Sequence, residues 1–201
     1  MKYALESLIG SEAIISKETV FFFDMDGTLI DTDYSNYLSY RQAVLDVTNG
    51  AIDIPFDPNR RLNRTALEKM FPHLCVDEIE KISTLKAEYY RRHLPKTKLN
   101  VDLVDVLANF KDRNRFILVT NCQEGRVVMT LKYHNLLQHF ESIFPRYRES
   151  GADRNKFVDA IESIRAKPEC ILVFENEETE IEKAIFAGIP RQNILNVANW
   201  R

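Results

Sequence analysis

Three short, continuously apolar runs constrain the fold of this chain more than any other feature. They are residues 20–23 (VFFF), 116–119 (FILV) and 170–174 (CILVF). Runs of this length without alternating polar residues are typical of strands that are buried on both faces, as in a parallel sheet. Weaker strand candidates lie at residues 142–144 and 193–197. The sequence therefore predicts a sheet that is covered by helices on both sides.

Helical patterns separate these strand candidates. Apolar residues recur at helical spacing over residues 127–140, 157–164 and 181–187, and Gly188 and Pro190 end the last of these segments. Alternating strands and helices predict βαβ units with right-handed crossovers. The predicted fold class is α/β, with a doubly wound parallel, Rossmann-like sheet. Residues 1–18 fit no element of this pattern, and a surface helix packed on the sheet is the hypothesis for them.

The segment from residue 33 to residue 98 has a different character. It contains no strand pattern, and its helical segments are expected near residues 34–48, 65–71 and 77–93, with a proline-bearing stretch at 54–58. A helical insertion after the first strand of a parallel sheet is typical of a lid. The sequence therefore predicts an α/β core domain formed by residues 1–32 and 99–201, and a helical cap domain formed by residues 33–98.

Composition and charge exclude several classes of protein. The 201 residues carry a formal net charge of −3, which argues against a nucleic-acid or anionic-membrane partner. No apolar run approaches the roughly 20 residues that span a bilayer, and Glu6 and Glu12 interrupt the N-terminus in a way that signal peptides do not. Three widely spaced cysteines fit neither a disulfide framework nor a zinc site. They predict reduced thiols in a cytoplasmic protein. The sequence leaves open whether the protein is a monomer or a homodimer.

Polar residues follow each of the three strong strand candidates. In open α/β sheets, ligands bind beyond the carboxyl ends of the strands. The polar residues at these ends are Asp24 and Asp26 after the first run, Thr120 and Asn121 after the second, and Glu175 and Asn176 after the third. Two acidic ends beside a hydroxyl and an amide predict a site that binds a cation together with an anion.

Asp24 and Asp26 are the sharpest signal in the chain. Residues two apart on an extended segment face the same side, so both carboxylates are expected to approach one site. Gly27 permits the tight turn that follows. Two neighbouring carboxylates favour different protonation states. One of them can therefore stay ionised as a nucleophile and metal ligand, while the other serves as a general acid and base.

The stretch FFFDMDGTLID, residues 21–31, resembles the first motif of the haloacid dehalogenase superfamily, DxDGT, and the match is complete. The resemblance runs from about residue 20 to residue 197. Thr120 stands as the second motif, a lysine as the third, and the acidic end of the third strand as the fourth. The insertion at residues 33–98 is similar to the small helical cap of the subfamily that contains phosphoglycolate phosphatases and β-phosphoglucomutase.

This resemblance implies a Mg²⁺-dependent phosphatase that acts on a small phosphorylated metabolite. Asp24 would attack phosphorus and form an aspartyl-phosphate. Asp26 would protonate the leaving oxygen and then activate water, while its backbone carbonyl faces the metal. Thr120 and the Asn121 amide would hydrogen-bond phosphoryl oxygens. Thr28 is the residue associated with phosphatase members, and carboxylate, carbonyl and phosphate oxygens are the ligands that Mg²⁺ prefers.

The cation of the third motif and the substrate contact of the cap are less sharply defined. The usual Lys-Pro-x-Pro is missing, and Lys156, in the first turn of a predicted helix, is preferred over Arg154. A positive charge there would stabilise the transferring oxygens. In the cap, Arg64 is similar in position to a substrate-discriminating arginine and could clamp a second phosphate or a carboxylate. A solvated basic face is the alternative interpretation of Arg64.

The acidic strand end departs from the family pattern at Asn176. Related proteins carry Glu-Asp or Gly-Asp there, so Glu175 is retained, Asn176 replaces the aspartate, and Glu180 falls on a later acidic position. The expected metal ligands are Asp24, Asp26, Glu175 and Asn176, with weakened Mg²⁺ binding. Two alternatives stay open. One is a phosphomutase of the β-phosphoglucomutase type, and the other is a degenerate binding protein with little turnover, which Asn176 would favour.

Overall fold

The structure is a computed structural model that describes residues 15–58, 60–146 and 154–200. The chain forms two compact units, which we describe separately. The first comprises the chain up to Ile30 and from Leu99 onward, and the second comprises Asp31–Lys98. The short strands β2 (Ile30–Asp31) and β3 (Lys98–Leu99) pair where the chain passes from one unit to the other and returns.

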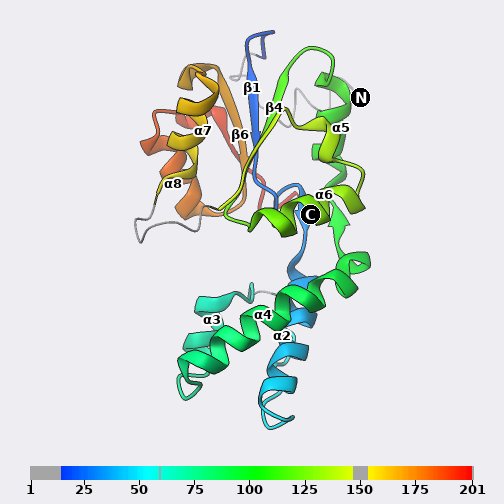
Figure 1. The fold of residues 1–201 in the computed structure, drawn as a ribbon. Helices are drawn as coiled ribbons and strands as arrows, with labels where there is room; N and C mark the ends of the chain where they lie inside the picture. The colour runs from blue at the N-terminus through cyan, green and yellow to red at the C-terminus, as the bar shows by residue number, and fades with distance from the viewer. Residues whose placement is uncertain (1–14, 59, 147–153, 201) are drawn as a thin grey trace. The chain divides into compact units, whose positions relative to one another are not determined.

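A five-stranded parallel sheet forms the centre of the first unit (Figure 1). Its strand order is β5-β4-β1-β6-β7. The strands are β1 (Val20–Phe23), β4 (Arg115–Val119), β5 (Ser142–Phe144), β6 (Ile171–Glu175) and β7 (Ile194–Asn196). Phe23 of the central strand is in register with Leu118 and Phe174. The polar residues that follow β1, β4 and β6 therefore emerge at the same edge of the sheet.

Helices cover both faces of this sheet, as Figure 1 shows. The helices are α5 (Val101–Phe110), α6 (Glu124–Tyr133), α7 (Lys156–Ile164) and α8 (Glu178–Phe186). Successive strand residues point to opposite faces. Accordingly, Phe21 and Phe23 join a core with residues of α5 and α6, while Phe22 joins a second core with residues of α7 and α8. This arrangement confirms the predicted doubly wound α/β fold.

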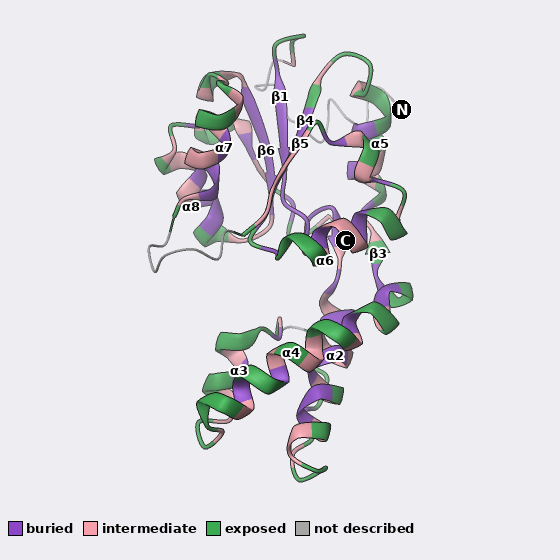
Figure 2. Ribbon diagram, in the orientation of Figure 1, coloured by how far each residue is buried: buried purple, intermediate pink, exposed green. Residues whose placement is uncertain are grey.

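The continuous apolar runs are explained by this double covering. Phe21, Phe22 and Phe23 are fully buried, and Figure 2 shows the central strands buried between helices that expose their outer surfaces. Each such side chain stabilises the fold by roughly 1.5–3 kcal/mol relative to an exposed one. Stacking adds to this, because the rings of Phe23 and Phe174 lie 4.8 Å apart. The core therefore anchors the edge of the sheet where β1 ends.

Two segments of the first unit differ from the sequence-based expectation. The helix predicted to run to residue 140 is wrong, because α6 ends at Tyr133 and Asn135 takes a left-handed backbone conformation with φ of 56°. A short 3₁₀ helix, Leu137–His139, follows. Helix α5 was not predicted at all; Asn100 caps it by accepting a hydrogen bond from the Leu103 amide at 3.4 Å. The hypothesis for residues 1–18 falls largely on residues 1–14, which lie outside the described part of the chain.

The second unit is helical. It contains α2 (Asp33–Val47), α3 (Arg64–Met70) and α4 (Val76–His93), followed by a short 3₁₀ helix, Leu94–Lys96. Helix α2 packs along α4 around its own apolar core, in which Ala43, Leu67 and Ile82 are fully buried. Asn49 and Gly50 both have positive φ, which ends α2. Because this core shares no residue with the two cores of the sheet, the second unit has a packing of its own.

Candidate active site

A tight turn after β1 places Asp24 and Asp26 at the edge of the sheet. The Asp24 amide still donates to the Phe174 carbonyl at 3.1 Å, as if the strand continued. Gly27, with φ of 82°, then reverses the chain, and its amide donates to the Ile30 carbonyl at 2.8 Å. A residue with a side chain is strained at that φ. The conformation of Gly27 therefore fixes the position of the two aspartates on either side of Met25.

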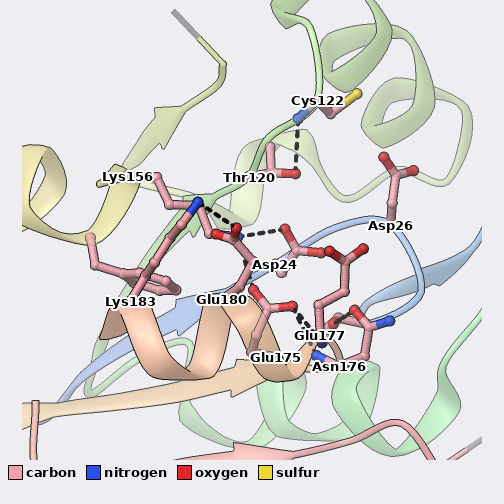
Figure 3. A network of polar contacts seen from close by, with 12 residues as sticks. Asp24, Asp26, Thr120, Cys122, Lys156, Glu175, Asn176, Glu177, Glu180 and Lys183 are labelled. Carbon is pink, nitrogen blue, oxygen red and sulfur yellow. Dashed lines mark hydrogen bonds and ion pairs between the residues drawn. The ribbon is translucent and has the colours of Figure 1, made fainter. Parts of the chain in front are cut away.

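Lys156, the first residue of α7, points at Asp24 from the neighbouring helix (Figure 3). Its Nζ lies 3.2 Å from Asp24 Oδ1 and 2.8 Å from Glu175 Oε2, and 3.5 Å from Glu180 Oε2. Burial alone would lower the pKa of Lys156, but the charges of Asp24, Glu175 and Glu180 outweigh it and raise that pKa above its ordinary value. Lys156 is therefore a fixed positive charge among three carboxylates.

Glu175, the last residue of β6, binds the Lys156 ammonium through one carboxylate oxygen. Its Oε2 accepts from Lys156, while its Oε1 accepts from the backbone amides of Asn176 at 2.9 Å and Glu177 at 3.1 Å. Burial and then the negative charge of Asp24 raise the pKa of Glu175 to about 7, although Lys156 opposes this shift. Glu175 was expected among the metal ligands, but in the structure both of its oxygens are engaged by nitrogen donors.

Glu180 completes the buried group from the first turn of α8. It was expected only as an auxiliary acid near the metal, and it is 5% exposed. Its Oε1 accepts from Lys183 at 3.0 Å, and its Oε2 faces Lys156. Burying this many charges is costly unless each has an opposite partner. The two lysines and three carboxylates therefore form one electrostatic cluster, shown in Figure 3.

Thr120 follows β4 on the other side of Asp24. Thr120 is 1% exposed, and its backbone amide donates to the Phe144 carbonyl at 2.9 Å. Thr120 Oγ1 accepts from the Cys122 amide at 3.3 Å. That bond uses an acceptor position of the hydroxyl and leaves its hydrogen for donation. Asn121, the other residue expected here, is exposed at the start of the same turn.

Asp26 has a partner that the sequence did not indicate. Arg126, the third residue of α6, donates from Nη1 to Asp26 Oδ1 at 3.2 Å and from Nη2 to Asp26 Oδ2. The two carboxylates of the turn were expected to approach one site together. In Figure 3 the Asp26 carboxylate instead lies apart from the cluster of Asp24, Lys156 and Glu180. No motif pointed to Arg126, because an arginine near a helix start is usually a surface residue.

Asn176 lies beside the backbone of the turn rather than in solvent. In one orientation of its amide, Oδ1 accepts from Thr28 Oγ1 at 2.9 Å. In the opposite orientation, Nδ2 donates to Thr28 Oγ1 at 2.9 Å, to the Asp26 carbonyl at 3.3 Å and to Glu175 Oε1 at 3.3 Å. The second orientation satisfies more partners. The amide of Asn176 thus faces the carbonyl oxygen that the family resemblance assigns to the metal.

The remaining two candidates lie elsewhere. Arg154 has a side chain that is 61% exposed and pairs with Asp159 at 3.5 Å. The structure thus brings Lys156, and not Arg154, to Asp24. Arg64 belongs to the second unit, where its guanidinium pairs with Glu68 at 2.9 Å in an exposed i,i+4 contact. Such a contact is typical of a helix surface.

The oxygens at this edge fit Mg²⁺, although with little negative charge. Within the described part of the chain, no group of three His, Cys, Asp or Glu side chains is arranged to hold a metal. The available oxygens are the Asp24 carboxylate, the Asp26 carbonyl and the Asn176 amide oxygen, after rotation of that amide. These are hard ligands of the kind that Mg²⁺ binds together with water. Only one of the three is charged, so the donor set predicts weak binding.

Comparisons with known proteins agree with this geometry. The model of the family described as haloacid dehalogenase-like hydrolase matches residues 21–194. A comparison with curated protein sequences found no significant match. None of the helices in the described part of the chain is long and apolar enough to cross a membrane.

Solved structures of the same fold include three from bacteria. A predicted phosphoglycolate phosphatase from Haemophilus somnus is 19% identical, with a TM-score of 0.72, 87% of this chain covered and 84% of that chain. A haloacid dehalogenase-like hydrolase from Streptococcus pneumoniae is 18% identical, with a TM-score of 0.69 and coverage of 87% and 83%. A β-phosphoglucomutase from Clostridium difficile is 17% identical, with a TM-score of 0.65 and coverage of 85% and 81%.

These likenesses establish the fold, and the family match establishes the membership. The matched segment begins in β1, includes the turn with Asp24 and Asp26, and ends in β7. It therefore contains every residue of the cluster described above. The chain belongs to the haloacid dehalogenase-like hydrolase family.

Proposed function

We propose that this hydrolase is a Mg²⁺-dependent phosphatase that cleaves a small organic phosphomonoester through an aspartyl-phosphate on Asp24. The observation that carries the proposal is the setting of Asp24. It is a buried carboxylate, 8% exposed, at the end of the central strand, with a buried ammonium 3.2 Å away. A buried carboxylate with an ammonium group beside it can act as a nucleophile.

Two steps share the residues of the turn. In the first, an Asp24 oxygen forms a bond to phosphorus, the ester P–O bond breaks, and Asp26 gives its proton to the leaving oxygen. In the second, Asp26 takes a proton from water, whose oxygen attacks phosphorus, and the Asp24–phosphorus bond breaks to release inorganic phosphate. Splitting the hydrolysis in this way lets one acid–base group serve both steps. Asp24 returns as a carboxylate beside Lys156.

Lys156 and Thr120 would bind the phosphoryl group. The raised pKa of Lys156 keeps it charged at neutral pH, so it offers a permanent cation to the transferring oxygens. Thr120 Oγ1 accepts from the Cys122 amide, which orients the hydroxyl hydrogen toward another acceptor. The Asn121 amide would be a second donor. Asp24, the Asp26 carbonyl and Asn176 would hold Mg²⁺. When bound, the ion would neutralise negative charge on the phosphoryl oxygens.

The substrate would be a small phosphorylated metabolite. The three cysteines are free thiols in the structure, which supports a reducing, cytoplasmic location. For Arg64 we propose a substrate contact from the cap, residues 33–98. We propose that Glu175 positions Lys156, in addition to any contact that it makes with the metal.

The phosphatase proposal is tested by phosphate release from p-nitrophenyl phosphate and acetyl phosphate, with and without Mg²⁺. We expect Mg²⁺-dependent turnover that Asp24→Asn lowers by about 10³-fold or more, as loss of a nucleophile does. Asp53→Asn is the matched control, because Asp53 is an exposed carboxylate of the other unit that pairs with Arg41. The control should retain wild-type turnover.

One alternative has a specific observation in its favour. Asn176 removes a negative charge from the expected metal ligands, which favours a protein that binds phosphorylated ligands and turns them over poorly. In that case the same assay shows no Mg²⁺-dependent release, and Asp24→Asn behaves like the wild type. Transfer of the phosphoryl group to a second sugar hydroxyl, instead of release as inorganic phosphate, would identify a mutase.

A further inference from the structure

The proposed chemistry does not use the ion pair between Arg126 and Asp26. Both guanidinium Nη atoms face both carboxylate oxygens, which is the fork geometry that arginine forms with carboxylates and phosphates. The side chain of Asp26 is 4% exposed, and that of Arg126 is 19% exposed. The pair is therefore shielded on the aspartate side and reachable from solvent on the arginine side.

This pair conflicts with the task assigned to Asp26. To protonate a leaving oxygen, Asp26 must leave the guanidinium, take up a proton from water and turn toward the phosphoryl group beside Asp24. Leaving would strand a charge on Arg126, which is costly at a site that is mostly buried. The movement becomes favourable when another anion takes the place of Asp26. A substrate that brings such an anion would release the acid–base residue as it binds.

We propose that Arg126 is a specificity-determining residue that exchanges Asp26 for an anionic group carried by the leaving group of the substrate. The chemical class is a phosphomonoester with a second anion, a carboxylate or another phosphate, on the alcohol portion. The inference rests on the proposed phosphatase function, because it names the substrate class of the same site. It requires no change in the residues that attack phosphorus.

Arg126 is better placed for this exchange than the lysines of the cluster. Lys156 contacts three carboxylates within 3.5 Å, and Lys183 contacts Glu180 at 3.0 Å. Lys156 is also needed beside the transferring phosphoryl group. Arg126 lies on α6, which follows the Thr120 strand end directly, and its planar fork binds carboxylate and phosphate equally well. The geometry thus separates a cation for the reacting phosphoryl group from a cation for a second anion.

Two matched ligand pairs distinguish the possible anions. 3-Phosphoglycerate and glycerol 3-phosphate differ by a carboxylate in place of a hydroxymethyl group. Glucose 1,6-bisphosphate and glucose 6-phosphate differ by a second phosphate. Calorimetric affinity and kcat/KM are measured for each member on the wild type, Arg126→Met and Arg126→Lys. Arg115→Met is the control, because Arg115 makes the same two-point contact with Glu141 at 2.8 and 2.7 Å on the surface of the same unit.

We expect the wild type to prefer the anionic member of at least one pair by about tenfold or more, the usual scale for a charge-assisted fork. Arg126→Met should abolish that preference while turnover of the neutral member stays equal or rises, since Asp26 is no longer held. Arg126→Lys should keep part of the preference, and Arg115→Met all of it. A folding defect would instead lower turnover of both members together.

Asp26→Asn provides a test that does not depend on the folding of the Arg126 variants. An asparagine at this position binds Arg126 less strongly than the Asp26 carboxylate does. The variant should therefore bind the anionic member of a pair more tightly, while its affinity for the neutral member stays that of the wild type. Absence of a wild-type preference in both pairs, or a preference that survives Arg126→Met, would overturn the inference. If affinities follow the expected pattern but no phosphate is released from any ligand, the phosphatase proposal fails and the anion specificity stands.

Discussion

The two units of this protein differ in the burial of their paired charged side chains. At the edge of the sheet, Lys156 has a side chain that is 7% exposed and contacts three buried carboxylates. In the helical unit, by contrast, Arg41 pairs with Asp53 at 2.6 and 2.7 Å, and the two side chains are 40% and 54% exposed. Exposed pairs contribute little to stability and form on many surfaces.

Buried charge clusters carry more functional information than surface pairs. Desolvation of several ions costs more than hydrophobic residues of the same size would, so such clusters are often found where a function needs them. The sheet edge therefore supports an argument about chemistry more strongly than the exposed ion pairs of the helical unit do. Substitutions in both units test this contrast.

The first prediction concerns the buried cation. Lys156→Met should lower the free energy of unfolding by about 3–5 kcal/mol, because it leaves Asp24, Glu175 and Glu180 buried without their shared partner. Arg41→Met, in the helical unit, should lower it far less, because an exposed pair contributes little to stability. Urea unfolding followed by circular dichroism measures both losses. The fluorescence of Trp200, whose ring centroid lies 6.2 Å from that of Phe174, reports on the sheet unit. Equal losses in the two variants would remove the contrast.

The second prediction concerns the separate core of the helical unit. Ile82→Ala should cost about 2–5 kcal/mol, because Ile82 is fully buried between the helices and leaves a cavity. Hydrogen exchange should accelerate at the amides of α2 and α4 while the amides of β1 and β6 keep their protection. Uniform acceleration in both units would mean that their stabilities are not separable.

The third prediction concerns Asn176 and the metal. Asn176→Asp restores a negative charge, so apparent Mg²⁺ affinity should rise by about tenfold, equivalent to about 1.4 kcal/mol. The measurement is the increase in Tm on titration with Mg²⁺, which does not depend on turnover. Without Mg²⁺ the variant should be less stable than the wild type, because another carboxylate joins Glu175. Asn196→Asp, an exposed change at the neighbouring strand end, is the control, and an identical response from both variants would place Asn176 outside the metal site.

The smallest effect is expected at the surface of the sheet unit. Arg115 hydrogen-bonds Glu141 and lowers its pKa below the ordinary value of 4.5. The pair therefore stabilises the fold above that value and loses its contribution as the pH falls through the folded pKa. Glu141→Gln should cost a few tenths of a kcal/mol at neutral pH, since both side chains are nearly half exposed, and less at about pH 3. Unfolding at the two pH values measures this, and a loss of equal size at both would contradict it.

The predictable part of the fold followed from local patterns. The runs at β1, β4 and β6 and the helices α2, α4, α7 and α8 were found because continuous apolar strands and helical spacing are visible along the chain. Helix α5 was missed although a capping asparagine precedes it. The end of α6 was misplaced because a left-handed Asn135 carries no strong sequence signal.

The candidate site divides in the same way. Asp24, Asp26, Thr120 and Glu175 could be picked out because each follows a strand whose carboxyl end was predictable, and the DxDGT stretch is specific. Parallel strands in register bring such ends to one edge. The sequence alone therefore determined the family resemblance, the sheet and the edge where the chemistry should lie.

Only the tertiary structure decided which charges meet. It brought Lys156 rather than Arg154 to Asp24, gave both oxygens of Glu175 to nitrogen donors, and paired Asp26 with Arg126 across 100 positions of the chain. These contacts depend on the rotation of α6 and α7 against the sheet, which packing of their apolar faces fixes. A one-residue change in helix phase turns a side chain by about 100°, so position along the chain could favour Lys156 over Arg154 but could not reveal the partners of Asp26 and Glu175.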